Sequence, residues 1–192
     1  MDMSFKQFLV NENRKYDYSS LLFELPEDVT DNVISWGFDH VPNESLFLDP
    51  KDPTFGREDD AHITLIYGIH TSNIKEVSSL FVKEKEFDCK LGKLDLFTKS
   101  DKFNVLIVSV ECEELHKLNR KMRRELEVTE SYPIYVPHVT ICYLKKDQGK
   151  EYIGNDVFDG VEFKLNKVLF SSKDGVKTPI KLGATCKKIG VA

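Results

Sequence analysis

The chain has 192 residues, of which 41% are hydrophobic and 31% are charged. Its net charge is −5, with a pI near 5.6, which argues against non-specific binding to duplex DNA because such binding depends on many phosphate contacts from Lys and Arg. A small nucleotide needs only a local positive pocket, so the charge leaves a nucleotide ligand open. The four scattered cysteines lack zinc spacing, and the sequence has no secretory signal and no apolar run of membrane length. We therefore expect a reducing, cytoplasmic compartment.

The first 19 residues differ in pattern from the rest of the chain. Phe5, Phe8 and Leu9 recur at helical spacing, and a polar, irregular stretch follows them. We therefore expect residues 1–19 to form a flexible leader with a short amphipathic helix, and residues 20–192 to form one domain. A terminal helix docked on the core is the alternative.

The domain is expected to begin with a strand over residues 21–25 and a helix that runs from Pro26 to about His40. Pro26 and two acidic residues lie in the first turn of this helix, where a fixed φ and negative charge suit the helix dipole. The positions expected to face the core are Val29, Val33, Trp36 and Phe38.

The later elements alternate between strand and helix patterns. Residues 103–111 are the most hydrophobic run, and the helix after them has one apolar face and one basic face, which we interpret as solvated. Residues 173–175 have the chemistry of a hairpin turn. The expected order is a loop over 41–61, a strand over 62–67, a helix over 72–82, strands over 87–97 and 103–111, a helix over 113–127, a loop over 131–137, a strand from 138, a weak helix over 147–153 and strands over 161–171 and 178–182.

One six-residue pattern occurs twice. Residues 62–67 and 138–143 both read His, apolar, Thr, two apolar residues, Tyr. Because successive side chains of a strand point to opposite faces, each His shares a face with its Thr, and Tyr67 and Tyr143 are expected in the core. The two copies lie about half a domain apart. Tandem halves usually pack about a pseudo-two-fold axis, which would place the two motif strands side by side.

Two histidines and two threonines facing one ligand suit the cleavage of a phosphodiester. Histidine titrates near pH 6.5, so near neutrality one imidazole can act as the base and the other as the acid. His62 and His138 are the candidates for these roles. The hydroxyls of Thr64 and Thr140 are expected to donate hydrogen bonds to nonbridging phosphate oxygens. This chemistry needs no metal or cofactor, and the sequence lacks the carboxylate pattern of a magnesium or manganese site. Two ordinary strand histidines are the alternative.

The chain resembles the two-histidine (2H) phosphoesterase superfamily, which includes RNA ligase-like proteins and cyclic phosphodiesterases. The resemblance rests on two His-x-Thr-x motifs, at residues 62–65 and 138–141, and on the duplicated order of elements over about residues 20–182. Residues 18–27 and 56–60 are similar to the subset found in phages. The resemblance implies an α+β, bilobal fold, in which two pseudo-symmetric lobes of antiparallel sheet with outer helices surround a central cleft.

The resemblance also implies metal-independent cleavage of 2′,3′-cyclic, 2′-5′ or cyclic oligonucleotide phosphodiesters, and some phage relatives degrade the cyclic oligonucleotide signals of bacterial immunity. The expected partner is a small nucleotide or cyclic oligonucleotide, and neither duplex DNA nor a membrane. The alternatives are a nucleotide-binding sponge without turnover and the processing of 2′-5′ or 2′,3′-cyclic RNA ends. The base, the linkage, the acid–base assignment and the oligomeric state stay open. The leader resembles packaging sequences of proteins carried inside phage heads.

Two more residues are predicted to bind the substrate. Tyr135, in the loop that leads to the second motif, is a candidate to stack a base, with simple packing as the alternative. Arg57, in the loop before the first motif, is a candidate to neutralise phosphate. The remaining histidines have no partner in the repeat and are interpreted as surface or helix-end residues.

Overall fold

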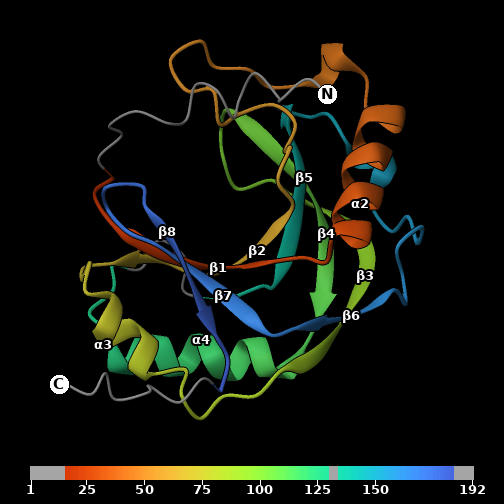
Figure 1. Cartoon of the computed structure of the whole chain (residues 1–192). Coiled ribbons are helices and arrows are strands. Elements are labelled where there is room, and N and C mark those ends of the chain that lie inside the picture. Colours follow the sequence, from red (N-terminus) through yellow and green to blue (C-terminus); the bar gives the residue numbers. More distant parts are fainter. Residues whose placement is uncertain (1–15, 130–133, 184–192) are drawn as a thin grey trace, which may run out of the picture.

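The computed structural model describes residues 16–129 and 134–183, and within these residues the strands form two four-stranded antiparallel sheets (Figure 1). The first sheet contains β1 (Ser19–Glu24), β2 (His62–Ile69), β7 (Lys167–Ser171) and β8 (Lys177–Lys181). The second sheet contains β3 (Phe87–Phe97), β4 (Phe103–Glu111), β5 (His138–Lys145) and β6 (Glu162–Leu165). The spatial order is β2-β1-β7-β8 in the first sheet and β5-β4-β3-β6 in the second. The amphipathic helix predicted for the leader lies outside the described residues.

Each motif strand is an edge strand of its sheet, next to an inner strand that opens one half of the chain. β2 pairs with β1, and β5 pairs with β4. β2 and β5 contact each other, so the two sheets meet along their motif strands. The prediction that the repeat places these strands side by side is confirmed, as is the α+β bilobal fold.

The helices cross from one half to the other. The helices are α2 (Glu27–His40), α3 (Ile74–Ser79) and α4 (Glu113–Glu125), with the short 3-10 turns η1 (Asn43–Ser45) and η2 (Lys150–Tyr152). α2 follows β1 of the first sheet but packs on β5 of the second, and α4 follows β4 of the second sheet but packs on β2 of the first. The approach of α2 is close, because a Cβ at Gly37 would come within 2.7 Å of the Ile141 side chain. The amide of Asn119 in α4, which is buried, donates to the carbonyl of Leu65 over 2.7 Å.

Both motif strands contain a β-bulge at the same place. The register skips Leu65 in β2 and Ile141 in β5, in each case the residue directly after the motif Thr. An extra residue shifts the side-chain alternation by one, so Tyr67 and Tyr143 return to the face that carries the His and Thr. The prediction of a core position is therefore wrong for Tyr67, whose side chain is 49% exposed, because the bulge reverses the simple strand alternation after Thr64.

The structure differs from the sequence-based expectation at three other places. The single strand predicted over 161–171 is β6 and β7, which belong to different sheets, because the chain crosses from the second sheet to the first at Asn166. Phe38, expected in the core, is 57% exposed. The weak helix over 147–153 is reduced to η2. The other predicted strands and helices are present, with ends shifted by a few residues.

The main core lies between the sheets and the helices. The inward-facing positions predicted on α2 are buried at Val29, Val33 and Trp36. The basic face of α4 is exposed at Lys117, Arg120 and Arg124. Lys121 of the same face is half-buried, and its ammonium donates to the Leu80 carbonyl and to the Glu84 carboxylate, over 2.6 Å in each case. Within the described residues no helix is long and apolar enough to cross a membrane.

Candidate active site

The four residues predicted as catalytic lie where the two sheets meet. His62 and Thr64 share one face of β2, and His138 and Thr140 share one face of β5. All four side chains are half-buried. β2 and β5 contact each other, and the charge of His62 contributes to the lowered pKa of His138. The structure therefore brings the two predicted pairs together at one site.

The two imidazoles are anchored in the same way. Nδ1 of His62 lies 2.8 Å from the carbonyl oxygen of Asp60, and Nδ1 of His138 lies 2.7 Å from the carbonyl oxygen of Val136. A carbonyl can only accept, so Nδ1 carries a proton in both rings. Nε2 of each ring is left to take a proton from a ligand or to give one. The repeat in sequence is thus also a repeat in ring geometry.

The surroundings of the two imidazoles are unequal. The ring of Phe97 lies edge-on to the ring of His138, with the centroids 4.8 Å apart. Burial lowers the pKa of His138 below its usual 6.5, the hydrogen bond to the Val136 carbonyl raises it, and the charge of His62 lowers it. Burial dominates because a charged imidazolium loses hydration in apolar surroundings. His138 therefore favours the neutral form.

Aliphatic residues of the inner strands support the two threonines. In the pairing register Leu22 of β1 lies beside Thr64, and Ile107 of β4 lies beside Thr140. Leu22 is 8% exposed and Ile107 is 1% exposed, and both lie on the His–Thr faces of their sheets, opposite to the main core. The polar groups of the site thus stand on an apolar floor, which strengthens electrostatic interactions with a bound phosphate.

Tyr135 connects the two motifs. Its hydroxyl donates to the backbone carbonyl of Thr64 over 3.1 Å, and its ring lies 5.6 Å from that of His116, edge to face. Burial raises the pKa of Tyr135, so the phenol stays protonated and keeps donating at any pH that the fold tolerates. This bond ties the loop before His138 to β2. The stacking of a base on Tyr135 stays a prediction.

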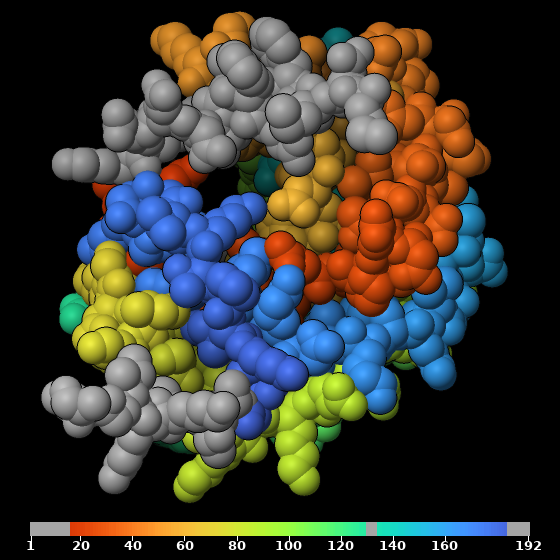
Figure 2. Space-filling model, in the orientation of Figure 1, coloured from red at the N-terminus to blue at the C-terminus, as the bar shows by residue number. Residues whose placement is uncertain are grey.

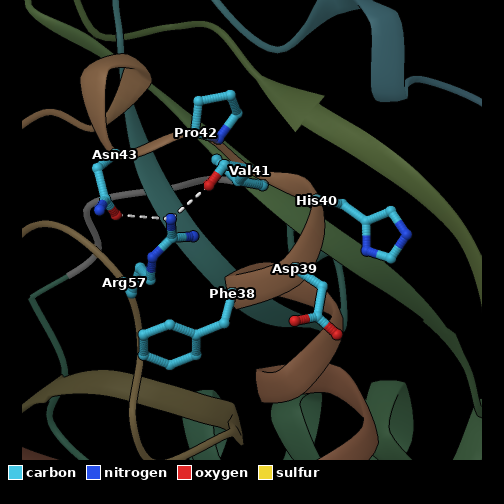
Figure 3. A pocket seen from close by; sticks show the side chains of 7 residues that line it. All are labelled: Phe38, Asp39, His40, Val41, Pro42, Asn43 and Arg57. Atoms are coloured by element: carbon cyan, nitrogen blue, oxygen red, sulfur yellow. Dashed lines mark hydrogen bonds between the residues drawn. The ribbon is translucent and has the colours of Figure 1, made fainter.

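Arg57 lies at the end of α2 (Figure 3). Its guanidinium donates to the carbonyls of Gly37 and Val41 and, over 2.9 Å, to the side-chain oxygen of Asn43. It also lies 5.0 Å from the centre of the Phe38 ring, a cation–π distance. These contacts attach the loop before the first motif to α2. The contact of Arg57 with phosphate stays a prediction.

Sequence reasoning missed three residues of this site. Phe97 and Ile107 come from strands without any motif. The ring contact with His138 reveals Phe97, and the register beside Thr140 reveals Ile107. Tyr67 was visible in the sequence as the third repeated residue of the pattern, but its face depends on the bulge. Among residues 16–129 and 134–183, no group of three or more His, Cys, Asp or Glu side chains is arranged to hold a metal ion.

Comparison with known proteins gives one family match. The family model described as anti-CBASS protein Acb1 matches residues 51–168, a span that contains both motifs. No curated protein matches the sequence.

Solved structures share the fold over nearly the whole chain. TT0787 of Thermus thermophilus has a TM-score of 0.63 at 16% identity, covering 87% of this chain and 98% of that one. Escherichia coli LigT complexed with 3′-AMP has a TM-score of 0.59 at 16% identity, with coverages of 89% and 96%. Kluyveromyces marxianus Usb1 with uridine monophosphate has a TM-score of 0.54 at 12% identity, with coverages of 86% and 99%. These structures are 2H phosphoesterases, so the resemblance in sequence is confirmed in the fold.

Proposed function

The chain belongs to the anti-CBASS protein Acb1 family, and from this membership and the site we propose that it is a metal-independent phosphodiesterase that cleaves a cyclic oligonucleotide. One observation carries the proposal. His62 and His138 stand on contacting strands with identical Nδ1 anchors, so each has Nε2 available for proton transfer. Cleavage of a phosphodiester needs one group to remove a proton and one to supply a proton.

The unequal surroundings of the two imidazoles assign one to the role of base and the other to the role of acid. His138 favours the neutral form, so it acts as the base and takes the proton of a ribose 2′-hydroxyl on Nε2. The 2′-oxygen attacks the adjacent phosphorus, the new P–O2′ bond forms, and the bond from phosphorus to the 5′-oxygen breaks. His62 gives its Nε2 proton to the departing 5′-oxygen. The products are a 2′,3′-cyclic phosphate and a free 5′-hydroxyl.

The threonines act on the phosphate itself. Thr64 and Thr140 lie two residues after their histidines on the same faces, so their hydroxyls can donate to the two nonbridging oxygens. Donors that are already in place cost no reorganisation when charge shifts in the transition state.

A small nucleotide substrate is favoured over a long RNA. The net charge of −5 does not supply the many phosphate contacts that a long strand needs. The anti-CBASS description of the family fits a cyclic oligonucleotide signal. Among the structural neighbours, LigT was solved with 3′-AMP and with NADP+, and Usb1 with uridine monophosphate.

The test is turnover in the presence of EDTA. The purified protein is incubated with cyclic di- and trinucleotides, a 2′,3′-cyclic mononucleotide and 2′-5′ oligoadenylate, beside His62→Ala and His138→Ala. His40→Ala, which changes a histidine outside both motifs, is the matched control. Turnover of a cyclic oligonucleotide is expected for the parent and for His40→Ala, with a loss of at least about 100-fold in both motif variants. Binding without turnover would contradict the proposal in favour of a sponge, and cleavage of only the other two substrate types would favour RNA end processing.

A further inference from the structure

Two of the three cysteines in the described part of the chain lie opposite each other on neighbouring strands. β3 and β4 are antiparallel, and their register ends with the pair of Lys90 and Glu111. The next residues along the two strands are Cys89 and Cys112. Opposed residues of an antiparallel pair have Cα atoms about 4.5–5.5 Å apart, which lies within the range of about 4.4–6.8 Å that a disulfide spans. The register therefore places the two cysteines at disulfide distance.

Both cysteines are free thiols that point into the main core. Cys89 is 3% exposed and Cys112 is 9% exposed. The backbone of Cys112 is still extended, with φ −165° and ψ 109°, so the strand alternation continues through it. Its sulfur lies 3.5 Å from the carbonyl oxygen of Asp88, the residue directly before Cys89. The two thiols therefore lie on the same side of the sheet.

The pair lies at the start of α4, which other elements cover. Figure 2 has the orientation of Figure 1, and from this side little of α4 (green) is visible behind α3 (yellow) and the hairpin of β7 and β8 (blue). The low exposure of both cysteines excludes a bulky thiol reagent from the folded protein. A small neutral oxidant needs only a local opening of the structure to reach them.

The two thiols differ in acidity. A hydrogen bond from the Cys89 thiol lowers the pKa of Cys112, burial raises it, and the backbone N–H groups of Leu115 and Glu114 lower it further. Cys112 is the N-cap of α4, where the positive end of the helix dipole favours a thiolate. The hydrogen bond with Cys112 and burial both raise the pKa of Cys89. Cys112 is therefore the thiol that ionises more readily, and Cys89 stays protonated beside it.

We propose that Cys89 and Cys112 form a reversible disulfide when the protein meets a peroxide. The Cys112 thiolate attacks one oxygen of hydrogen peroxide and the O–O bond breaks. The leaving hydroxide takes up the proton that Cys112 had lost, which gives water and a sulfenic acid on Cys112. The sulfur of Cys89 then attacks the sulfenic sulfur, and the S–S bond forms while the S–O bond breaks. The proton of Cys89 leaves with this hydroxide as a second water, so the two thiols lose two electrons and the peroxide gains them. A dithiol reductant restores both thiols.

The disulfide ties β3 to the start of α4 and is expected to stabilise the fold. A cross-link stabilises a protein mainly because it restricts the unfolded chain. The urea midpoint of the protein is therefore expected to rise after treatment with peroxide and to return to its first value after treatment with dithiothreitol. A midpoint that stays the same after oxidation would overturn this stabilising role. The proposal is independent of the proposed function, because the phosphodiesterase site uses neither cysteine.

The test counts thiols and maps the bond in the full chain with Cys186→Ser, which leaves three of the four cysteines. The folded protein is treated with hydrogen peroxide and then unfolded for thiol counting and mass spectrometry. We expect two of the three thiols to be lost, with a mass decrease of about 2 Da for the two hydrogens of the disulfide. Peptide mapping is expected to join Cys89 to Cys112. Adding Cys142→Ser, which removes a buried thiol of β5 outside the pair, is the matched control and is expected to leave this disulfide unchanged.

Serine variants of the pair test the order of the steps. Cys89→Ser is expected to stop at the sulfenic acid of Cys112, which dimedone labels, and Cys112→Ser is expected to give neither the label nor the disulfide. Serine is close in size to cysteine and is a good N-cap, so both variants are expected to fold, which circular dichroism checks. Three results would overturn the proposal: thiols that all survive the peroxide, a disulfide that includes Cys142, or sulfinic acid on Cys112 beside an intact Cys89 thiol.

Discussion

At the scale of single residues, the two histidines are alike in anchoring and unlike in surroundings. Both donate Nδ1–H to the carbonyl two residues earlier in the chain. Burial lowers the pKa of His138, and the aromatic ring of Phe97 lies at its side. A repeated motif therefore produces two chemically distinct imidazoles, which is what acid–base catalysis requires.

This difference predicts the pH dependence of activity. The base must be neutral, and the pKa of His138 is lowered, so the acidic limb of kcat/KM is expected below pH 6.5. Phe97→Ala admits water beside His138 and is expected to move that limb toward pH 6.5, because hydration favours the charged form. The measurement is kcat/KM against pH with EDTA present. An acidic limb above pH 6.5 in the parent would show that His138 is not the base.

At the scale of elements, bulges and tight backbone contacts set what the motif strands present. The bulges at Leu65 and Ile141 decide which side chains share the cleft face. Farther along β2, the carbonyl of Gly68 accepts from the N–H of Thr129 over 2.9 Å. Gly68 has a φ of +90°, and a Cβ there would lie 2.2 Å from the Thr129 carbonyl oxygen. Only glycine allows this pairing.

Gly68→Ala is therefore expected to destabilise the fold strongly. Gly160 is the matched control, because its φ is +91° but a Cβ there would meet nothing within 4 Å. Gly160→Ala should lower the free energy of unfolding by about 1–2 kcal/mol, the cost of the left-handed conformation alone. Gly68→Ala should lower it by more than about 3 kcal/mol, because the clash adds to that cost. Urea unfolding measures both, and equal losses would refute the proposed clash.

At the scale of the whole molecule, a segment from each half of the chain pairs with the motif strand of the other half. The loop before the first motif pairs with β5, where the backbone N–H of Glu58 donates to the carbonyl of Ile141 over 3.0 Å. The segment before the second motif pairs with β2, where Ile69 bridges to Val128. The bond from Tyr135 to the carbonyl of Thr64 adds a third connection. The relative position of the two histidines therefore depends on contacts between the halves.

Tyr135→Phe tests this dependence. The variant loses one hydrogen bond, which is expected to lower the free energy of unfolding by about 1 kcal/mol. Because the loop that leads to His138 is no longer tied to β2, kcat is also expected to fall by about 10- to 100-fold. Tyr152→Phe loses a similar bond, from its hydroxyl to the carbonyl of His40 over 2.8 Å, away from the cleft. It should lose stability without losing kcat, and a parallel fall in kcat would argue against a special role for Tyr135.

The sequence by itself determined the element pattern, the two motifs and the fold class. These follow from local chemistry: apolar periodicity, helix-start residues, and a pattern repeated in frame. The tertiary structure decided which side chains share the cleft face, how the two histidines differ and where the chain changes sheet. Each of these depends on contacts between residues far apart in the chain. The register beside β1 and β4 created the bulges that bring Tyr67 to the cleft. Packing against Phe97 made His138 unlike His62, and the crossing at Asn166 divided one predicted strand between two sheets.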